Sequence, residues 1–345
     1  MSTLRPGVIM RALSVGLAVS LLAISGVSYA GEPAQPQQCW SAQALAGTPE
    51  ELKPHHPKAP LDLAALRQQP LPPISPVPET LRGSIRGVEL PPGEKKIALT
   101  FDLCEESGYV AGYDGRIVDL LRAQGIKATF FAGGKWLETH PERAEQLIAD
   151  PLFEVGSHGL RHYDLSYVGE PSLKDEVTLP EAAYARAKAR LEARQCLLGD
   201  APPASQERIT LMRFPYGRCN AKSLAAAAEA GLIAIQWDLI TGDPDPNASA
   251  KEIARRIIAG VHPGAIIVAH ANGRGQHTAE ALALALPKLK EEGYSFVTVS
   301  ELLNAGRPVI SQTCYQNRPG DSTRVAHDLP RKGGHDVQPN FETPN

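Results

Sequence analysis

The stretch IALTFDLCEES, residues 97–107, joins a buried apolar run to a cluster of reactive side chains. Its first five residues, 97–101, have the length and composition of a core β-strand. Asp102 follows, then Leu103 and Cys104, then two glutamates. A solvated strand end would account for the acids, but it would not account for the cysteine between them. The rest of the sequence is needed to tell whether this strand end is a solvated surface or part of a functional site.

Six further apolar runs of strand length follow, and helical patterns separate them. They cover residues 128–132, 153–156, 211–214, 232–237, 265–269 and 296–299. Seven strands that alternate with helices predict an α/β fold with a parallel sheet, either doubly wound or closed into a barrel. Thr178-x-x-Glu181 and Ser249-x-x-Glu252 are candidate capping boxes that mark helix starts. No glycine-rich phosphate loop follows the first strand, so a nucleotide-binding sheet is the less attractive choice.

The first 30 residues have the pattern of an export signal. Arg5 and Arg11 precede an apolar run over residues 12–27, and Ser28-Tyr29-Ala30 is a small-x-small cleavage site. The apolar run is short and no stop-transfer charges follow it, so we expect no stable membrane insertion after cleavage. The mature protein is predicted to be periplasmic or secreted.

Composition and charge bound the remaining organisation of the chain. The chain of 345 residues has a formal net charge of −3, and its sequence shows no basic stripe. We therefore expect no nucleic acid partner. After the signal peptide of residues 1–30 comes a proline-rich N-terminal extension, residues 31–94, which we interpret as an extended arm. The barrel is predicted over residues 95–303, and a C-terminal extension and tail over residues 304–345.

Reactive side chains follow one predicted strand after another. In a β/α barrel the carboxyl ends of the strands share one mouth, where active sites form. The strand ends supply Asp102 with Glu105, then His158 with His162, Arg213 with Tyr216 and Cys219, Trp237 with Asp238 and Asp243, and finally His270. A random surface would not produce such a series, so the mouth is predicted to be a site.

The pair His158 and His162 predicts a metal site. One helical turn brings residues four apart to the same side of the chain. Two neutral imidazoles and a carboxylate make an open site suited to zinc or a related divalent ion. An isolated H-x-x-x-H is more often two surface histidines. Here the pair follows a core strand and Asp102 ends another, so we expect one divalent metal ion, with zinc as its identity.

Four motifs resemble those of one enzyme family. TFD (residues 100–102), HGLRH (158–162), RFPYG (213–217) and VAH (268–270), in this order and spacing, are similar to the motifs of the polysaccharide deacetylases of carbohydrate esterase family four. The resemblance covers residues 95–303. It implies a distorted (β/α)7 barrel, a divalent metal, and hydrolysis of N-acetyl groups on an amino-sugar polysaccharide such as peptidoglycan, chitin or an exopolysaccharide.

The resemblance also implies a role for each matching residue. Asp102 resembles the catalytic base, Arg213 the residue that orients the base, Tyr216 the backbone donor to the oxyanion, His270 the general acid, and His158 and His162 the metal ligands. These residue types suit the reaction, because a carboxylate can take a proton from water and an imidazolium can give one to the departing amine. The proline of RFPYG fixes the backbone that presents the Tyr216 amide.

Three positions depart from the family pattern. Leu103 stands where a second acid usually ligates the metal, Gly159 where a serine or threonine follows the first histidine, and Ile240 where an acid tunes the catalytic histidine. The third ligand is therefore Asp102 itself, Glu105 or a water molecule. A Cys104 thiolate is a further option, although oxidation is the more expected fate of a cysteine in an exported protein.

Five cysteines in the exported part of the chain predict disulfides and leave one thiol over. Cys39 and Cys314 flank the barrel from opposite ends, and we expect them to pair. Cys104 and Cys219 follow strands that end at the same mouth, and we expect a second bridge between them. Cys196 is then the free thiol.

Two other functions share the predicted fold. The same metal and barrel could act on an O-acetyl ester or another amide. Alternatively, Leu103 could mark a catalytically inactive barrel that only binds glycan. Metal content and acetate release distinguish these hypotheses.

Overall fold

A computed structural model of the chain describes Met1 and residues 39–57, 60–71, 73–194, 196, 206–319 and 321. Apart from Met1, the predicted signal peptide, residues 1–30, lies outside the described residues. The elements described below belong to one compact unit, Ala34–Asn345. Within the described ranges, no helix is long and apolar enough to cross a membrane.

All seven predicted strands are present in one ten-stranded sheet. They are β2 (Lys96–Leu103), β3 (Ala128–Ala132), β4 (Phe153–Ser157), β5 (Leu211–Met212), β6 (Ile233–Ile235), β8 (Ile266–His270) and β9 (Ser295–Val297). Three strands escaped prediction, namely β1 (Ser84–Glu89), β7 (Leu239–Ile240) and β10 (Arg307–Ser311). β7 is too short to give a periodic signal, and β1 and β10 lie in the extensions, outside the region of alternating strands and helices.

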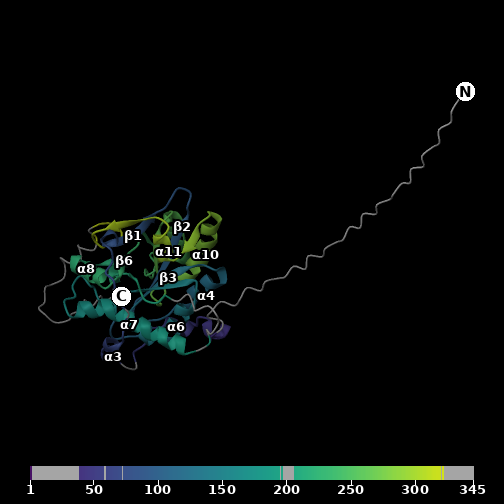
Figure 1. The fold of residues 1–345 in the computed structure, drawn as a ribbon. Coiled ribbons are helices and arrows are strands. Elements are labelled where there is room, and N and C mark those ends of the chain that lie inside the picture. Colours follow the sequence, from purple (N-terminus) through teal and green to yellow (C-terminus); the bar gives the residue numbers. More distant parts are fainter. Residues whose placement is uncertain are drawn as a thin grey trace. The chain divides into compact units, whose positions relative to one another are not determined.

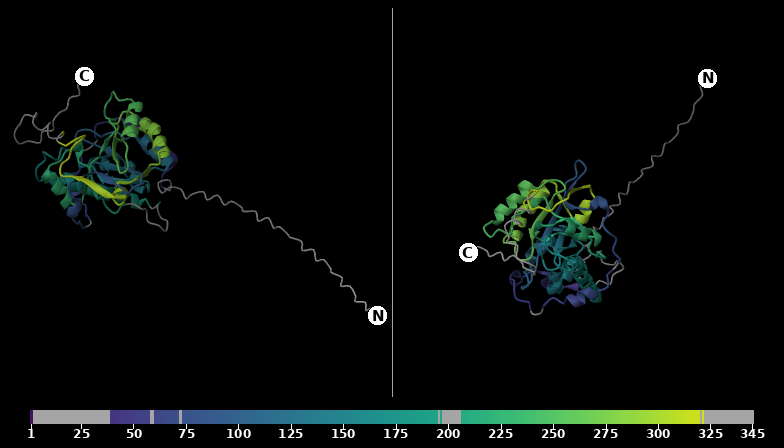
Figure 2. Two further views of the ribbon diagram at one scale, coloured as in Figure 1. Left: turned by 90° about the horizontal axis from the view of Figure 1, so that it is seen from above. Right: turned by 90° about the vertical axis from the view of Figure 1, so that its left-hand side faces the viewer.

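The sheet is parallel except at one end, and it curls into a partial barrel (Figures 1 and 2). Its strand order is β10-β1-β6-β5-β4-β3-β2-β8-β7, and β9 pairs with the start of β2. Only the β1–β10 pair is antiparallel among these ladders. The amide of Val88 donates a 3.0 Å hydrogen bond to the carbonyl oxygen of Gly264, where a Cβ would lie 1.7 Å from the oxygen of Val88. Glycine is therefore required at this close approach.

The curled, mostly parallel sheet with helices outside it confirms the prediction of an α/β barrel-type fold.

The two faces of β2 carry different side chains because side chains alternate along a strand. Ile97, Leu99, Phe101 and Leu103 belong to the larger hydrophobic core, between the sheet and the helices. Ala98 belongs to a second, smaller core inside the curl of the sheet. Asp102 shares the face of Ala98, so it lies inside the curl at the carboxyl end of the strand.

Helices follow most strands and cover the outside of the sheet (Figure 1). They are α4 (Gly115–Gln124), α5 (Gly134–Thr139), α6 (Pro141–Ala149), α7 (Ser172–Ala193), α8 (Ala221–Glu229), α9 (Ala250–Gly260), α10 (Thr278–Glu291) and α11 (Val299–Leu303). The capping box at Ser249 is confirmed at the start of α9. The one at Thr178 is wrong: α7 begins six residues earlier, because its apolar face already includes the buried Leu173 and Val177.

The described part of the N-terminal extension packs on the barrel instead of extending away from it. It forms α2 (Ala42–Leu45), α3 (Leu63–Gln68) and two 3-10 turns, Pro49–Leu52 and Glu79–Leu81, before strand β1. Trp40, Leu45 and Leu66 are buried in the larger core. Their contacts lie far along the chain, so the local pattern of residues 31–94 did not indicate them.

The disulfides differ from the predicted pairing. Cys39 is bonded to Cys196, and Cys219 to Cys314, with Cα–Cα distances of 5.2 and 5.3 Å. Cys104 is a buried free thiol. The predicted pairs Cys39–Cys314 and Cys104–Cys219 are therefore wrong. Cys104 comes directly after β2 and lies beside His158 and His162, while Cys219 meets the segment that follows β10.

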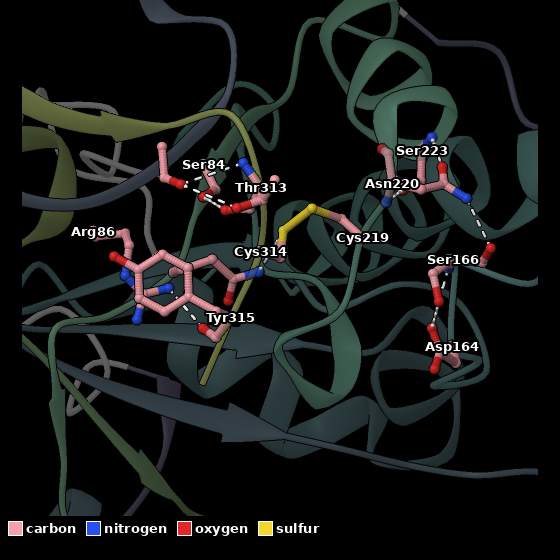
Figure 3. Close-up of a disulfide and its surroundings, with 12 residues drawn as sticks. Ser84, Arg86, Asp164, Ser166, Cys219, Asn220, Ser223, Thr313, Cys314 and Tyr315 are labelled. Atoms are coloured by element: carbon pink, nitrogen blue, oxygen red, sulfur yellow. Dashed lines mark hydrogen bonds between the residues drawn. A yellow bond between two sulfur atoms is a disulfide. The ribbon is translucent and has the colours of Figure 1, made fainter. Parts of the chain in front are cut away.

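This segment, residues 313–316, is held against β1 as well as by its disulfide (Figure 3). Ser84 Oγ donates to the carbonyl oxygen of Thr313 at 2.9 Å. The guanidinium of Arg86 donates to the carbonyl oxygens of Tyr315 and Gln316 at 2.7 and 3.0 Å, and lies 3.5 Å from the centre of the Tyr315 ring. The Gln316 amide in turn donates to the carbonyl oxygen of Tyr216 at 3.1 Å. The C-terminal segment thus contacts the RFPYG loop.

The Cys39–Cys196 bridge is expected to stabilise the protein substantially, because it closes a loop of 157 residues. The double variant Cys39→Ser/Cys196→Ser should lose about 2–4 kcal/mol of unfolding free energy in urea titrations. Wild-type protein in strong reductant serves as the comparison. Peptide mapping without reduction should recover both bridges, and a peptide with Cys104 in a disulfide would contradict the observed pairing.

Candidate active site

The six residues predicted for the site come together at the carboxyl ends of the strands. They are Asp102, His158, His162, Arg213, Tyr216 and His270. Asp102 Oδ1 lies 2.9 Å from Arg213, and its Oδ2 lies 3.6 Å from Nε2 of His158. The rings of His158 and His162 are 4.9 Å apart between centroids, and those of His162 and Tyr216 are 4.4 Å apart. Asp102 and His270 are directly paired residues of β2 and β8.

Arg213 is fully buried and holds the Asp102 carboxylate in place. Its guanidinium donates to Asp102 Oδ1 at 2.9 Å, to Thr100 Oγ1 at 2.8 Å and to the carbonyl oxygen of Gln236 at 3.1 Å. Burial raises the pKa of Asp102, but His158, Arg213 and His270 more than offset this effect, so the pKa lies below its ordinary value. Asp102 is therefore a carboxylate that can accept a proton.

His158 has the tautomer that a metal ligand needs. Its Nδ1 lies 2.9 Å from the carbonyl oxygen of Arg213, which can only accept, so Nδ1 is the donor. Nε2 is then free to bind a metal through its lone pair. Burial lowers the pKa of His158 to about 3, which keeps the ring neutral. A histidine oriented by a backbone carbonyl in this way is typical of metal sites.

His162 and Tyr216 are the two residues other than glycine that have positive φ angles in the described part of the chain. Their φ values are 60° and 58°. Such conformations are uncommon for residues with side chains, and they concentrate at functional sites where the surrounding structure enforces them. His162 is 2% exposed, and neither of its ring nitrogens has a hydrogen-bond partner. With Nδ1 3.7 Å from Oε1 of Glu106 and no hydrogen bond of normal length, this buried imidazole is available to bind a ligand.

Glu176 of α7 fixes the loop that carries both histidines. Its carboxylate, fully buried, accepts from the amides of Leu160 and Arg161 at 3.0 and 2.9 Å, and from Nε of Arg161 at 2.7 Å. Gly159, one of the departures from the family pattern, has a φ of 73°, which favours glycine over serine or threonine. Glu176 was not predicted, because it lies within a helix and belongs to no motif.

His270 is paired with an acid, although Ile240 departs from the family pattern. Nδ1 of His270 lies 3.0 Å from Oδ1 of Asp243. The other oxygen of Asp243 accepts from the His270 amide and from Thr278 Oγ1, both at 2.7 Å. Burial lowers the pKa of His270. Negative charges, chiefly that of Asp243, raise this pKa by more than burial lowers it, so the pKa lies above its ordinary value. Asp243 thus supplies the charge that position 240 lacks.

The glutamates of DLCEE point to different places. The Glu105 carboxylate is fully buried, 3.1 Å from Nζ of Lys135, and accepts from Thr139 Oγ1 at 2.9 Å and the Ala111 amide at 3.0 Å. Glu105 is thus held by these partners, and the expectation that it could supply the third metal ligand is wrong. Glu106 instead faces the site and accepts from the Tyr216 hydroxyl at 3.0 Å.

One group of side chains in the described part of the chain fits a metal ion. Cys104, His158 and His162 each offer a ligand atom, and the three atoms lie within 4.8 Å of one another. All three residues are buried, at 4%, 2% and 2% exposure. Neutral imidazoles and a sulfur atom are donors that zinc prefers. The unpaired nitrogens of His162 agree with this fit.

A barrel mouth with a buried carboxylate, an acid-paired histidine and side chains that could hold a metal ion fits a hydrolase of the α/β class. Comparisons with known proteins identify its family. The sequence pattern of the family described as polysaccharide deacetylase matches residues 89–235. A peptidoglycan-N-acetylglucosamine deacetylase of Bacillus cereus is 30% identical over 217 residues, which are 62% of this chain and 91% of that protein. A chitooligosaccharide deacetylase of Bradyrhizobium is 28% identical over 227 residues, or 61% and 91% of the two chains.

The fold agrees with this relationship. The crystal structure of a peptidoglycan N-acetylglucosamine deacetylase in complex with 4-naphthalen-1-yl-N-oxidanyl-benzamide matches with a TM-score of 0.53 and 24% identity. The match covers 67% of this chain and 99% of that one. The chain belongs to the polysaccharide deacetylase family, which is carbohydrate esterase family four.

Glu105→Gln should destabilise the fold and leave metal binding intact. The substitution leaves Lys135 buried without its charge partner, which typically costs about 3 kcal/mol. Urea unfolding should report the loss, and the metal content per chain should match that of wild type. Glu229→Gln, at an exposed position at the end of α8, is the matched control. If Glu105→Gln instead lost metal and kept its stability, Glu105 would be a metal ligand after all.

Proposed function

We propose that the protein is an exported, metal-dependent hydrolase that removes N-acetyl groups from an amino-sugar polysaccharide. One observation carries the proposal: Asp102 and His270 are paired across β2 and β8, each with its own charged partner, beside the two histidines. Two groups whose environments move their pKa values in opposite directions are the usual mark of an acid and base pair.

The substrate class and the location rest on further observations. The relatives from Bacillus cereus and Bradyrhizobium are named for peptidoglycan N-acetylglucosamine and for chitooligosaccharide, which are both amino-sugar substrates. The N-terminal sequence has the pattern of an export signal. Two disulfides suit an oxidising compartment. We therefore place the protein in the periplasm or outside the cell.

Asp102 acts as the general base in the proposed reaction. A divalent metal held by His158 and His162 would supply Lewis-acid polarisation of the acetamide carbonyl and of a water molecule. Asp102 takes the proton of the attacking water, since Arg213 keeps it ionised and fixes its direction. Arg213 itself is fully buried and positions the base without reaching the substrate.

Tyr216 and His270 complete the reaction. The left-handed backbone of Tyr216 presents its amide to the oxyanion that forms on the acetyl carbonyl. His270 holds its Nδ1 proton toward Asp243, so a second proton on Nε2 is available for the departing amine. The products are acetate and a free amino group on the sugar.

Acetate release from defined substrates tests the proposal. The protein loaded with zinc should release acetate from an N-acetylated amino-sugar polymer or oligomer, and a panel of peptidoglycan, chitin oligomers and exopolysaccharide identifies the polymer. Faster release from O-acetylated glycan would favour the esterase function. Binding of glycan with no acetate from any substrate would instead establish an inactive barrel.

Asp243→Asn should move the alkaline limb of the kcat/KM profile to lower pH. Asp243 raises the pKa of His270, and without it the effect of burial, which lowers the pKa, prevails. His270 must be protonated to act as an acid, so a lower pKa removes activity at a lower pH. Asp245→Asn, an exposed acid in the same loop, should leave the profile in place.

His270→Ala should lower kcat by ~10²–10⁴-fold, the usual contribution of general acid catalysis. Zinc content should stay the same, because His270 is outside the metal-binding group. A variant with full kcat would remove His270 from the mechanism.

A further inference from the structure

We propose that the thiolate of Cys104 is the third protein ligand of the metal ion, in place of the acid that the family carries at the position of Leu103. The proposal deepens the proposed function and rests on it in one respect, namely that His158 and His162 bind a divalent ion. It assigns a sulfur ligand to a site where the family pattern provides an oxygen ligand.

The geometry of strand β2 brings Cys104 rather than Leu103 to the site. Leu103 is fully buried in the core between the sheet and the helices. Cys104 is the first residue after β2, and continuing the alternation of that strand by one step puts it on the side of Asp102. There its sulfur and one ring nitrogen from each histidine lie within 4.8 Å of one another. Asn272 fixes this position, because its Nδ2 donates to the Cys104 carbonyl oxygen at 2.8 Å.

The nearby carboxylates have other partners. Glu105 is bound to Lys135, Thr139 and the Ala111 amide. Glu106 is 3.7 Å from Nδ1 of His162 and accepts from the Tyr216 hydroxyl. That arrangement is typical of a carboxylate that orients a ligating histidine rather than one that binds the metal. Asp102 has one oxygen on Arg213 and is needed as the base.

His162 gives an independent indication that a ligand belongs here. It is 2% exposed and its backbone is in the left-handed region. Neither ring nitrogen has a partner at hydrogen-bond distance, and Nδ1 lies 3.7 Å from Oε1 of Glu106. Burial of an unsatisfied polar group destabilises a fold. A metal ion shared with Cys104 and His158 would satisfy one ring nitrogen of His162, while Glu106 faces Nδ1.

The other cysteines leave Cys104 as a thiol. The other four cysteines form two disulfides, Cys39–Cys196 and Cys219–Cys314, so none of them is left to oxidise Cys104. Cys104 is 4% exposed, which shields it from reagents and from a second chain. A buried thiol whose sulfur lies within 4.8 Å of ring nitrogens of two histidines is placed as a metal ligand.

A sulfur ligand changes which metals the site selects. Thiolate is a soft donor that favours zinc, whereas carboxylate sites also suit magnesium and manganese. Zinc bound by two histidines and one cysteine retains a fourth position for water or substrate, as catalytic zinc sites require. We therefore expect zinc or cobalt to bind with much higher affinity than magnesium or manganese.

X-ray absorption of the zinc-loaded, full-length protein tests the ligand directly. The zinc spectrum should require one sulfur neighbour at about 2.3 Å together with nitrogen or oxygen neighbours at about 2.0–2.1 Å. Replacement of zinc by cobalt should produce an intense near-ultraviolet charge-transfer band from thiolate to cobalt. Cys104→Ser should abolish both signals and weaken zinc binding by more than about 100-fold, since changes to outer partners alone cost 10–100-fold.

Two further variants keep the result interpretable. Leu103→Met alters the neighbouring residue on the opposite face of β2 with little change in volume, and should retain the cobalt band. Cys104→Asp, which supplies a carboxylate, should bind metal without the band. Circular dichroism of each metal-free variant, and its two disulfides by mapping, establish that it has folded.

The outcomes separate this proposal from the proposed function. A metal-loaded wild-type protein with only nitrogen and oxygen neighbours would overturn the cysteine ligand and leave the deacetylase proposal standing. A wild-type protein that binds no divalent metal would overturn both. A sulfur neighbour that disappears in Cys104→Ser and persists in Leu103→Met establishes Cys104 as the ligand, whether or not the substrate has been found.

Discussion

The buried guanidinium of Arg213 links the barrel to its chemistry. It joins three strands, because it donates to side chains of β2 and to carbonyl oxygens at and just after the end of β6, while its own backbone follows β5. The rings of Phe131 and Trp237 lie 4.2 and 5.4 Å from it. Removing one partner from a buried pair of charges is strongly destabilising, so Arg213 and Asp102 depend on each other for the fold as well as for the site.

Two aspartates with different neighbours support the proposed acid and base roles: Asp102 is the base, and Asp243 is the partner of the acid, His270. Asp102 faces an arginine, which is always charged, so it has no proton to exchange with its partner and remains a carboxylate. Asp243 faces a histidine, and it stabilises the protonated ring. Asp102 thus stays deprotonated and Asp243 keeps His270 protonated. The ladder between β2 and β8 places Asp102 and His270 side by side.

Local patterns predicted the strands and most of the site, while long-range contacts limited the rest. The apolar runs and the motifs at their ends indicated the barrel and six site residues, since strand length and strand-end chemistry are local properties. β1 and β10 were not predicted because neither alternates clearly and each needs the other as a partner 218–227 residues away. The disulfides, Glu176 and the partner of His270 depend on which loops meet in space, and spacing along the chain does not encode that. Cys104 lies one residue beyond the end of β2, so the strand pattern did not show that its thiol is buried and unpaired with another cysteine.

The pairing of β1 with β10 has a consequence for the sheet as a surface. An open strand edge offers unpaired backbone groups to other chains and invites aggregation. The two terminal strands of this sheet are poor templates: β7 has two residues, and β10 contains Pro308, which has no N–H to donate. β1, five of whose six residues are buried, is covered on one side by β6 and on the other by β10. β10, the last strand in the described part of the chain, thereby protects β1 from edge-to-edge association, and the protein has this protection only when it is synthesised through residue 311.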